Sequence, residues 1–65
     1  MDFKDKILRV RCDLNLSQEA LAKELGVSFA TVNRWEKGHA RPSILFENKF
    51  NKYCFANNIK FEEKE

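Results

Sequence analysis

The sequence has few of the residues from which metal centres, disulfide frameworks and catalytic sites are built. It contains two cysteines and one histidine among 65 residues. Cys12 and Cys54 lie far apart with no Cys-x-x-Cys spacing, and His39 completes no familiar zinc-ligand pattern with them. We therefore expect no metal and no cofactor. We also expect both thiols to be reduced and buried as small hydrophobic side chains.

Long apolar runs and catalytic motifs are absent as well. Charged and apolar residues alternate over Met1–Val10, which is unlike a secretory signal or a membrane span. No paired carboxylates flank a glycine-rich loop, and there is no nucleophile elbow. We expect a cytoplasmic protein that is not an enzyme, does not enter a membrane and has no evident small-molecule ligand.

What is present indicates one small folded domain. A chain of 65 residues is near the lower limit at which a hydrophobic core supports itself without disulfides or metal, and its 43% hydrophobic content favours folding. The net charge is only +2, but positive charge is concentrated in residues 28–42. This stretch contains Arg34, Lys37 and Arg41 but only one acid, Glu36. This positively charged segment could contact a phosphate backbone.

Apolar residues recur at spacings of three and four, which predicts an all-α fold. The expected helices are Phe3–Asp13, Gln18–Leu25, about Phe29–Glu36, and a fourth from after Ser43 to near Asn57. The proposed N-caps are Asp2, Ser17, Ser28 and Ser43. Gly26 and Gly38 can adopt the left-handed backbone that ends a helix.

The second and third predicted helices meet the physical demands of two short helices packed at a steep angle. Ala22 supplies the small residue at the close approach, and Gly26 supplies the turn. The buried anchors are expected to be Leu21, Leu25, Val27, Val32 and Trp35. The outward face of the third helix then carries Phe29, Ala30, Asn33, Arg34 and Lys37. This is the helix-turn-helix pattern, in which the second helix of the pair enters a DNA groove.

From Ile7 to about Ser43 the chain resembles the Cro and phage-repressor type of helix-turn-helix, the XRE family. The matching residues are Arg11, Leu16-Ser17-Gln18-Glu19, Leu21-Ala22, Leu25-Gly26-Val27-Ser28, Val32, Trp35-Glu36, Gly38 and Arg41-Pro42-Ser43. The resemblance implies a compact, lambda-repressor-like bundle of four to five helices. It also implies a sequence-specific regulator of transcription that binds double-stranded DNA, with a repressor as the favoured role.

The resemblance assigns base contacts to the third helix, at Phe29, Ala30, Asn33 and Arg34. Arginine can bind guanine and asparagine adenine through paired hydrogen bonds, whereas apolar side chains meet thymine methyl groups. The alternative for Asn33 and Arg34 is a solvated helix face, and for Phe29 it is packing against the second helix. Both alternatives stay open at this point.

Phosphate contacts are expected from a second set of residues: Gln18, Ser28, Lys37, His39, Arg41 and Ser43. In the family, the glutamine at the position of Gln18 touches a phosphate or a partner side chain at the groove; alternatively, Gln18 is an ordinary exposed residue of a first helical turn. The family also commonly pairs the positions of Arg11 and Glu36, so we expect an ion pair between the first helix and the end of the third.

The remaining questions concern partners. One alternative function is a protein-interaction module or antitoxin whose main partner is another protein. We expect a homodimer, because one reading helix contacts few base pairs. The DNA-binding domain is predicted to cover residues 1–58, with 59–65 as a short extended tail and a candidate dimer contact. Ile44 and Phe55 could join Ile59 and Phe61 in an exposed apolar patch; alternatively, Phe61 folds back onto the first helix.

Overall fold

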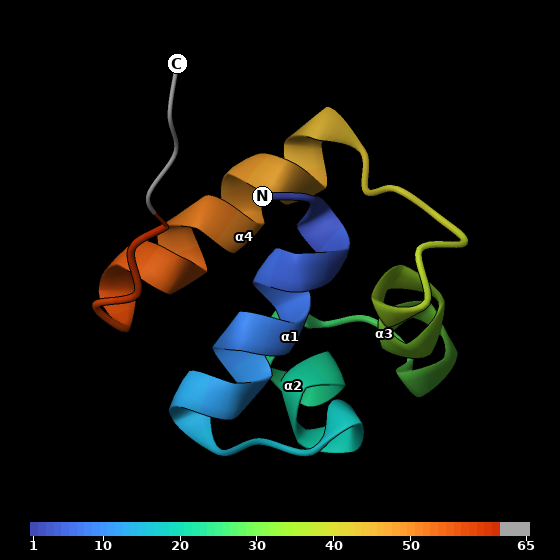
Figure 1. The fold of residues 1–65 in the computed structure, drawn as a ribbon, viewed down its shortest axis with the longest axis horizontal. Helices are drawn as coiled ribbons and strands as arrows, with labels where there is room; N and C mark the ends of the chain where they lie inside the picture. Colours follow the sequence, from blue (N-terminus) through green and yellow to red (C-terminus); the bar gives the residue numbers. More distant parts are fainter. Residues whose placement is uncertain (62–65) are drawn as a thin grey trace.

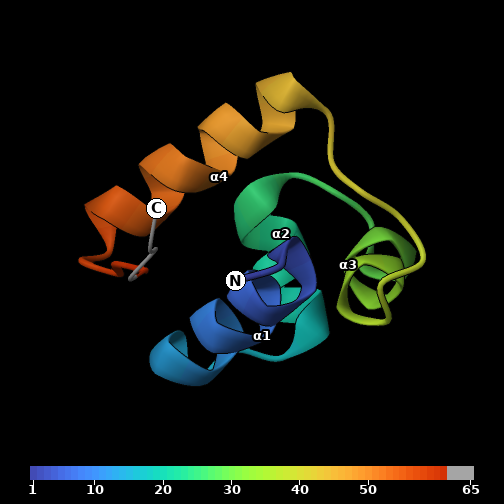
Figure 2. The same cartoon turned by 45° about the horizontal axis from the view of Figure 1, so that its top comes forward.

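The computed structural model describes residues 1–61, and the predicted frayed end, Glu62–Glu65, lies outside the described residues. Four helices form within that range, and no strand does: α1 (Phe3–Leu14), α2 (Gln18–Leu25), α3 (Phe29–Glu36) and α4 (Ile44–Ala56). The expected small all-α bundle is therefore confirmed. An extended connection carries the chain from α3 to the start of α4 (Figures 1 and 2).

Serine side chains begin three of the four helices. The hydroxyl oxygens of Ser17, Ser28 and Ser43 accept backbone N–H groups at 3.0, 3.1 and 3.2 Å respectively. Asp2 has the extended backbone of an N-cap, but its side chain makes no capping hydrogen bond. The predicted starts of α2, α3 and α4 are thus correct because their caps are local in sequence.

Residues with a left-handed backbone conformation end the first two helices. Gly26, at φ 73°, closes α2, and its backbone lets Val27 N–H donate to the Ala22 carbonyl at 3.0 Å. Gly38, at φ 77°, follows the end of α3. Asn15, at φ 56°, ends α1 one residue later than predicted, a role that asparagine tolerates better than most residues.

One hydrophobic core joins all four helices and the segment after them. Its buried members are Ile7, Val10, Leu21, Ala22, Leu25, Val32, Trp35, Phe50, Cys54 and Ile59. Phe3 links α1 to two partners, with its ring centroid 5.3 Å from that of Trp35 and 5.0 Å from that of Phe50. Trp35 is therefore a core residue, as predicted.

The segment after α4 closes this core. Ile59 is only 6% exposed, and the ring of Phe61 stacks on that of Phe50 with the centroids 6.4 Å apart. Lys6 and Arg9 of α1 place their cationic groups 5.4 and 5.7 Å from the Phe61 ring centroid. The fold-back alternative for Phe61 is thus correct, and Ile59 does not belong to an exposed patch.

The two thiols have different surroundings. Cys54 is buried, but Cys12 is exposed, so the prediction that both are buried was wrong for Cys12. Cys12 lies off the stripe on which Ile7 and Val10 point into the core. Burial raises the pKa of the Cys54 thiol to about 11, although the nearby charge of Lys6 acts in the opposite direction.

This difference predicts selective labelling. A pKa raised from 9.0 to about 11 lowers the thiolate fraction of Cys54 about 100-fold at neutral pH, and burial adds steric protection. Iodoacetamide should therefore modify Cys12 in the folded protein, and Cys54 only after denaturant is added. Peptide mass mapping at about pH 7.5 measures both sites. Equal modification of the two thiols in the folded protein would contradict the buried position of Cys54.

Candidate nucleic-acid interface

The packing of α2 against α3 decides which face of α3 remains available. Leu21, Ala22 and Leu25 of α2 are buried, as are Val32 and Trp35 of α3. The short connection through Gly26 holds the two helices together, and α3 buries one side only. Its opposite side therefore faces solvent.

The four predicted base-contacting residues lie on that solvent-facing side to different degrees. Ala30 and Arg34 are exposed, Phe29 is 48% exposed, and Asn33 is half-buried. Residues separated by three and four positions share a helix face, so Ala30, Asn33 and Arg34 lie together on α3. Of the four, Asn33 offers the least accessible side chain.

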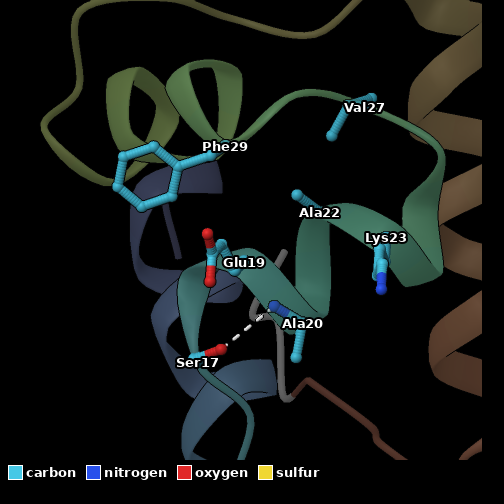
Figure 3. A pocket seen from close by; sticks show the side chains of 7 residues that line it. All are labelled: Ser17, Glu19, Ala20, Ala22, Lys23, Val27 and Phe29. Carbon is cyan, nitrogen blue, oxygen red and sulfur yellow. Dashed lines mark hydrogen bonds between the residues drawn. The ribbon is translucent and has the colours of Figure 1, made fainter.

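Phe29 also borders a hollow between α2 and the start of α3. This hollow of about 500 Å³ is lined by Ser17, Glu19, Ala20, Ala22, Lys23, Val27 and Phe29. Figure 3 shows the Phe29 ring and the Lys23 side chain at different sides of the hollow. The ring thus lies beside α2 without being buried against it, which leaves about half of its surface open to a ligand.

The predicted phosphate-binding residues are mostly at the surface. Lys37, His39 and Arg41 are exposed along the connection that follows α3. Ser28 and Ser43 are exposed too, but their hydroxyl oxygens already accept backbone N–H groups of their own helices. Phosphate binding at these two positions would therefore use the unpaired backbone N–H groups of the first helical turn.

A polar network joins the first three helices. The Arg11 guanidinium donates from Nε to Glu36 Oε2 at 2.6 Å and from Nη2 to Oε1 at 3.1 Å. Its Nη1 donates to the Leu16 carbonyl at 3.2 Å, which ties in the loop between α1 and α2. The hydrogen bond to Glu36 raises the pKa of Arg11 above its usual value, against the opposing effect of burial.

Gln18 is the third member of this network, and sequence reasoning missed this role. Its Nε2 donates to Glu36 Oε1 at 2.6 Å, so the start of α2 is joined to the end of α3. The side chain is half-buried rather than freely exposed. Gln18 and Glu36 are 18 residues apart, and no local spacing could indicate the contact.

This network changes the charge that α3 presents to solvent. Glu36 is the only acidic residue between Ser28 and Ser43. Its side chain is only 7% exposed and is paired with Arg11. The exposed ionisable side chains of this stretch are therefore two arginines, one lysine and one histidine. Such a surface attracts a polyanion despite the small net charge of the chain.

Two short helices joined by a glycine turn, the second with one face open to solvent, define a helix-turn-helix. A family model described as "Helix-turn-helix" matches residues 7–46, which is more than half of the chain. The chain belongs to this family, and the predicted XRE-type resemblance is confirmed.

The chain is similar to three regulators of transcription, and it covers a different share of the length of each. The chain is 44% identical over 51 residues to the uncharacterized HTH-type transcriptional regulator MJ0272 of Methanocaldococcus jannaschii, covering 78% of this chain and 77% of that protein. It is 36% identical over 61 residues to the uncharacterized HTH-type transcriptional regulator YgzD of Bacillus subtilis, covering 94% and 88%. It is 39% identical over 44 residues to the HTH-type transcriptional activator BcrR of Enterococcus faecalis, covering 68% of this chain.

The chain spans only 22% of the length of BcrR. No solved structure matches the chain. Family membership and these relatives support the broader part of the prediction, a DNA-binding regulator of transcription. Within residues 1–61, no helix is long and apolar enough to cross a membrane.

Proposed function

We propose that this protein is a sequence-specific transcriptional regulator that places α3 in the major groove of double-stranded DNA. The observation that carries the proposal is the charge of the surface around α3. Glu36, the only acid between Ser28 and Ser43, is paired with Arg11, and every exposed ionisable side chain of that stretch is an arginine, lysine or histidine. An α-helix fits the major groove, and phosphates on both sides would meet this positive surface.

Arg34 is the proposed residue for direct base reading. It is exposed on the free face of α3, and its guanidinium can donate two hydrogen bonds to guanine O6 and N7. Phe29 and Ala30 are proposed to contact thymine methyl groups, since neither side chain has a hydrogen-bonding group. Asn33 is a secondary candidate because its side chain is half-buried.

Affinity is proposed to come from contacts that carry no sequence information. Lys37, His39 and Arg41 would bind phosphates with their side chains, and Ser28 and Ser43 with the helix N-termini that they begin. Gln18 would contact a phosphate with the N–H that it does not donate to Glu36. This division separates residues that change specificity from residues that change overall affinity.

The separation is tested on Arg34. Selection from a random duplex pool should enrich one motif, and Arg34→Ala should weaken binding to it by about 5- to 150-fold, equivalent to ~1–3 kcal/mol. Arg34→Ala should lose base discrimination at one base-pair position of the motif only. Lys37→Ala should instead weaken binding to all duplexes alike and reduce the salt dependence of binding. Electrophoretic mobility shifts measure both. If Arg34→Ala weakened binding to all duplexes equally, Arg34 would not be a base-reading residue.

An interaction module or antitoxin is the second candidate function. The exposed apolar residues of α4 favour it, because a protein partner could cover them. Tight binding to a co-purified protein, beside weak and sequence-independent DNA binding, would favour this candidate.

Repression is the proposed direction of regulation, since occupying a promoter is sufficient for it. A reporter gene placed behind the selected motif tests this. Lower expression on production of the protein supports repression, and higher expression indicates an activator.

We further propose that the protein acts as a homodimer on DNA. A single α3 reads only a few base pairs, and two-fold related helices would read half-sites about one helical turn apart. A footprint of a palindrome supports the dimer, and protection of a single half-site contradicts it.

A further inference from the structure

The exposed face of α4 is the most unusual surface of the described chain. Ile44, Leu45 and Phe55 are 77%, 82% and 81% exposed, the highest values among its large hydrophobic side chains. All three lie on α4, which buries Phe50 and Cys54 on its other side. Large apolar side chains that remain this open on one helix indicate a surface that a partner covers.

The positions of these residues along α4 follow a simple pattern. Ile44 and Phe55 are 11 residues apart, which is three helical turns or about 16 Å on one face. Leu45 flanks Ile44 at the N-terminal end. Asn48 and Asn51 lie between the two ends on the same face, so this stripe itself is uncharged, while the exposed Glu47 and Lys52 flank it on either side.

We propose that this face binds a second copy of the chain, with the two α4 helices antiparallel across a two-fold axis. The axis would pass near the midpoint of the stripe, between residues 49 and 50. Ile44 of one copy would then meet Phe55 of the other, and Asn48 would meet Asn51. Because the same stripe supplies both halves of each pair, the surface is complementary to itself, as a two-fold interface requires.

The size of the surface indicates a weak dimer. Three large side chains bury on the order of 400 Å² per copy, about half of the roughly 800 Å² per partner in stable interfaces. The free protein would therefore dimerise only at high concentration. On a two-half-site duplex the copies are held close together, and the same contact would produce cooperative binding. This last step rests on the proposed function; self-association in the absence of DNA does not.

Oppositely charged variants test both the surface and the register. Ile44→Glu and Phe55→Lys each place a charge in the proposed contact, and each charge suits the dipole at its end of α4, so the helix should persist. Each variant alone should raise the dimer dissociation constant at least tenfold. An equimolar mixture should recover to within about threefold of the parent protein, because the introduced carboxylate of one copy then meets the introduced ammonium group of the other.

Sedimentation equilibrium up to millimolar protein, without DNA, is the measurement. Leu8→Lys is the matched control, since Leu8 is an exposed hydrophobic residue on α1, and it should leave the dissociation constant unchanged. Circular dichroism confirms that each variant is folded. A parent protein that stays monomeric throughout overturns the proposal, and a mixture that associates no better than the single variants overturns the antiparallel register.

A second arm measures cooperativity on duplexes with one and two half-sites. Phe55→Lys, at the opposite end of α4 from the proposed phosphate contact at Ser43, should abolish cooperativity while leaving single-half-site affinity unchanged. If the parent protein associates in solution but binds no DNA, the proposed function fails and the interface stands. If it binds two half-sites without cooperativity and stays monomeric in solution, the interface fails and DNA binding stands.

Discussion

Glu36→Ala should lower the free energy of unfolding by about 2–3 kcal/mol, a value between those for exposed and fully buried ion pairs. The Glu36 side chain is 7% exposed and that of Arg11 is 27% exposed. Removal of the carboxylate leaves the Arg11 guanidinium and the Gln18 amide without their shared acceptor. The guanidinium can still reach some water, which keeps the loss below that of a fully buried charge.

A loss of this size is large for such a short chain. A single core in a domain below about 70 residues rarely supplies more than ~3–5 kcal/mol. Glu36→Ala should therefore remove about half of the stability or more and lower the melting temperature by roughly 10–20 °C. Thermal and urea unfolding followed by circular dichroism measure the change.

A double-mutant cycle with Arg11→Ala separates the ion pair from other effects of the substitution. A coupling of about 1–2 kcal/mol is expected, because the two side chains form two direct hydrogen bonds. Gln18→Ala should cost less, about 1 kcal/mol, since it removes one hydrogen bond. Negligible coupling between Arg11 and Glu36 would sink the role assigned to this network in joining α1 to α3.

The Arg11–Glu36 pair of this network is expected to affect DNA binding without contacting DNA, whereas Gln18 is the network member proposed to contact a phosphate. The network joins the start of α2 to the end of α3 and thereby holds the two helices of the reading unit in their relative orientation. It also pairs the only acidic side chain between Ser28 and Ser43 with Arg11. Stability and the electrostatics of the proposed interface thus depend on one carboxylate.

The helices could be predicted from the sequence because the signals that begin and end them are local. Serine caps at Ser17 and Ser28 lie next to the residues they cap, and Gly26 lies at the turn it forms. The predicted bounds of α2 and α3 agree with the structure for that reason. Membership of the helix-turn-helix family could be predicted too, since its matching residues occur at fixed spacing.

Other features depended on tertiary contacts that no spacing reveals. The Gln18–Glu36 hydrogen bond joins residues 18 positions apart, and the exposure of Cys12 depends on how α1 is turned against its neighbours. Which residues of α3 contact DNA stays a prediction, because a base contact depends on the geometry of the duplex as well as on the exposure of the side chain.

The segment after α4 is the clearest example of a tertiary contact that the sequence did not reveal. Ile59 was predicted to lie outside the domain, in a short tail or an exposed patch. The turn after α4 has Asn58 at φ 60°, and Ile59 N–H donates to the Cys54 carbonyl at 2.9 Å. That turn returns the chain to the core, so Ile59 is 6% exposed. Asparagine tolerates left-handed backbone, but the sequence alone does not show that it adopts it here.

Ile59→Ala therefore tests whether this segment is a structural part of the domain. Removing a buried isoleucine side chain costs about 2–5 kcal/mol, because apolar contacts are lost and a cavity remains. The value here should be near the lower end, about 2–3 kcal/mol, since Ile59 lies outside the helices, where the backbone can shift to fill part of the space. Ile44→Ala is a matched control: the same substitution at a 77% exposed position should change stability by less than about 0.5 kcal/mol.

Urea unfolding of both variants at micromolar protein, where the proposed dimer is dissociated, measures the difference. Phe61 stacks on Phe50 just beyond Ile59, so loss of Ile59 should also loosen that contact and increase amide hydrogen exchange at the C-terminal end of α4. If Ile59→Ala proved as neutral as Ile44→Ala, residues 59–61 would be an appendage and the domain would end at Asn58. If the cost is several times larger, any fragment designed for DNA-binding studies must extend at least to Phe61, because the core that supports α3 includes this segment.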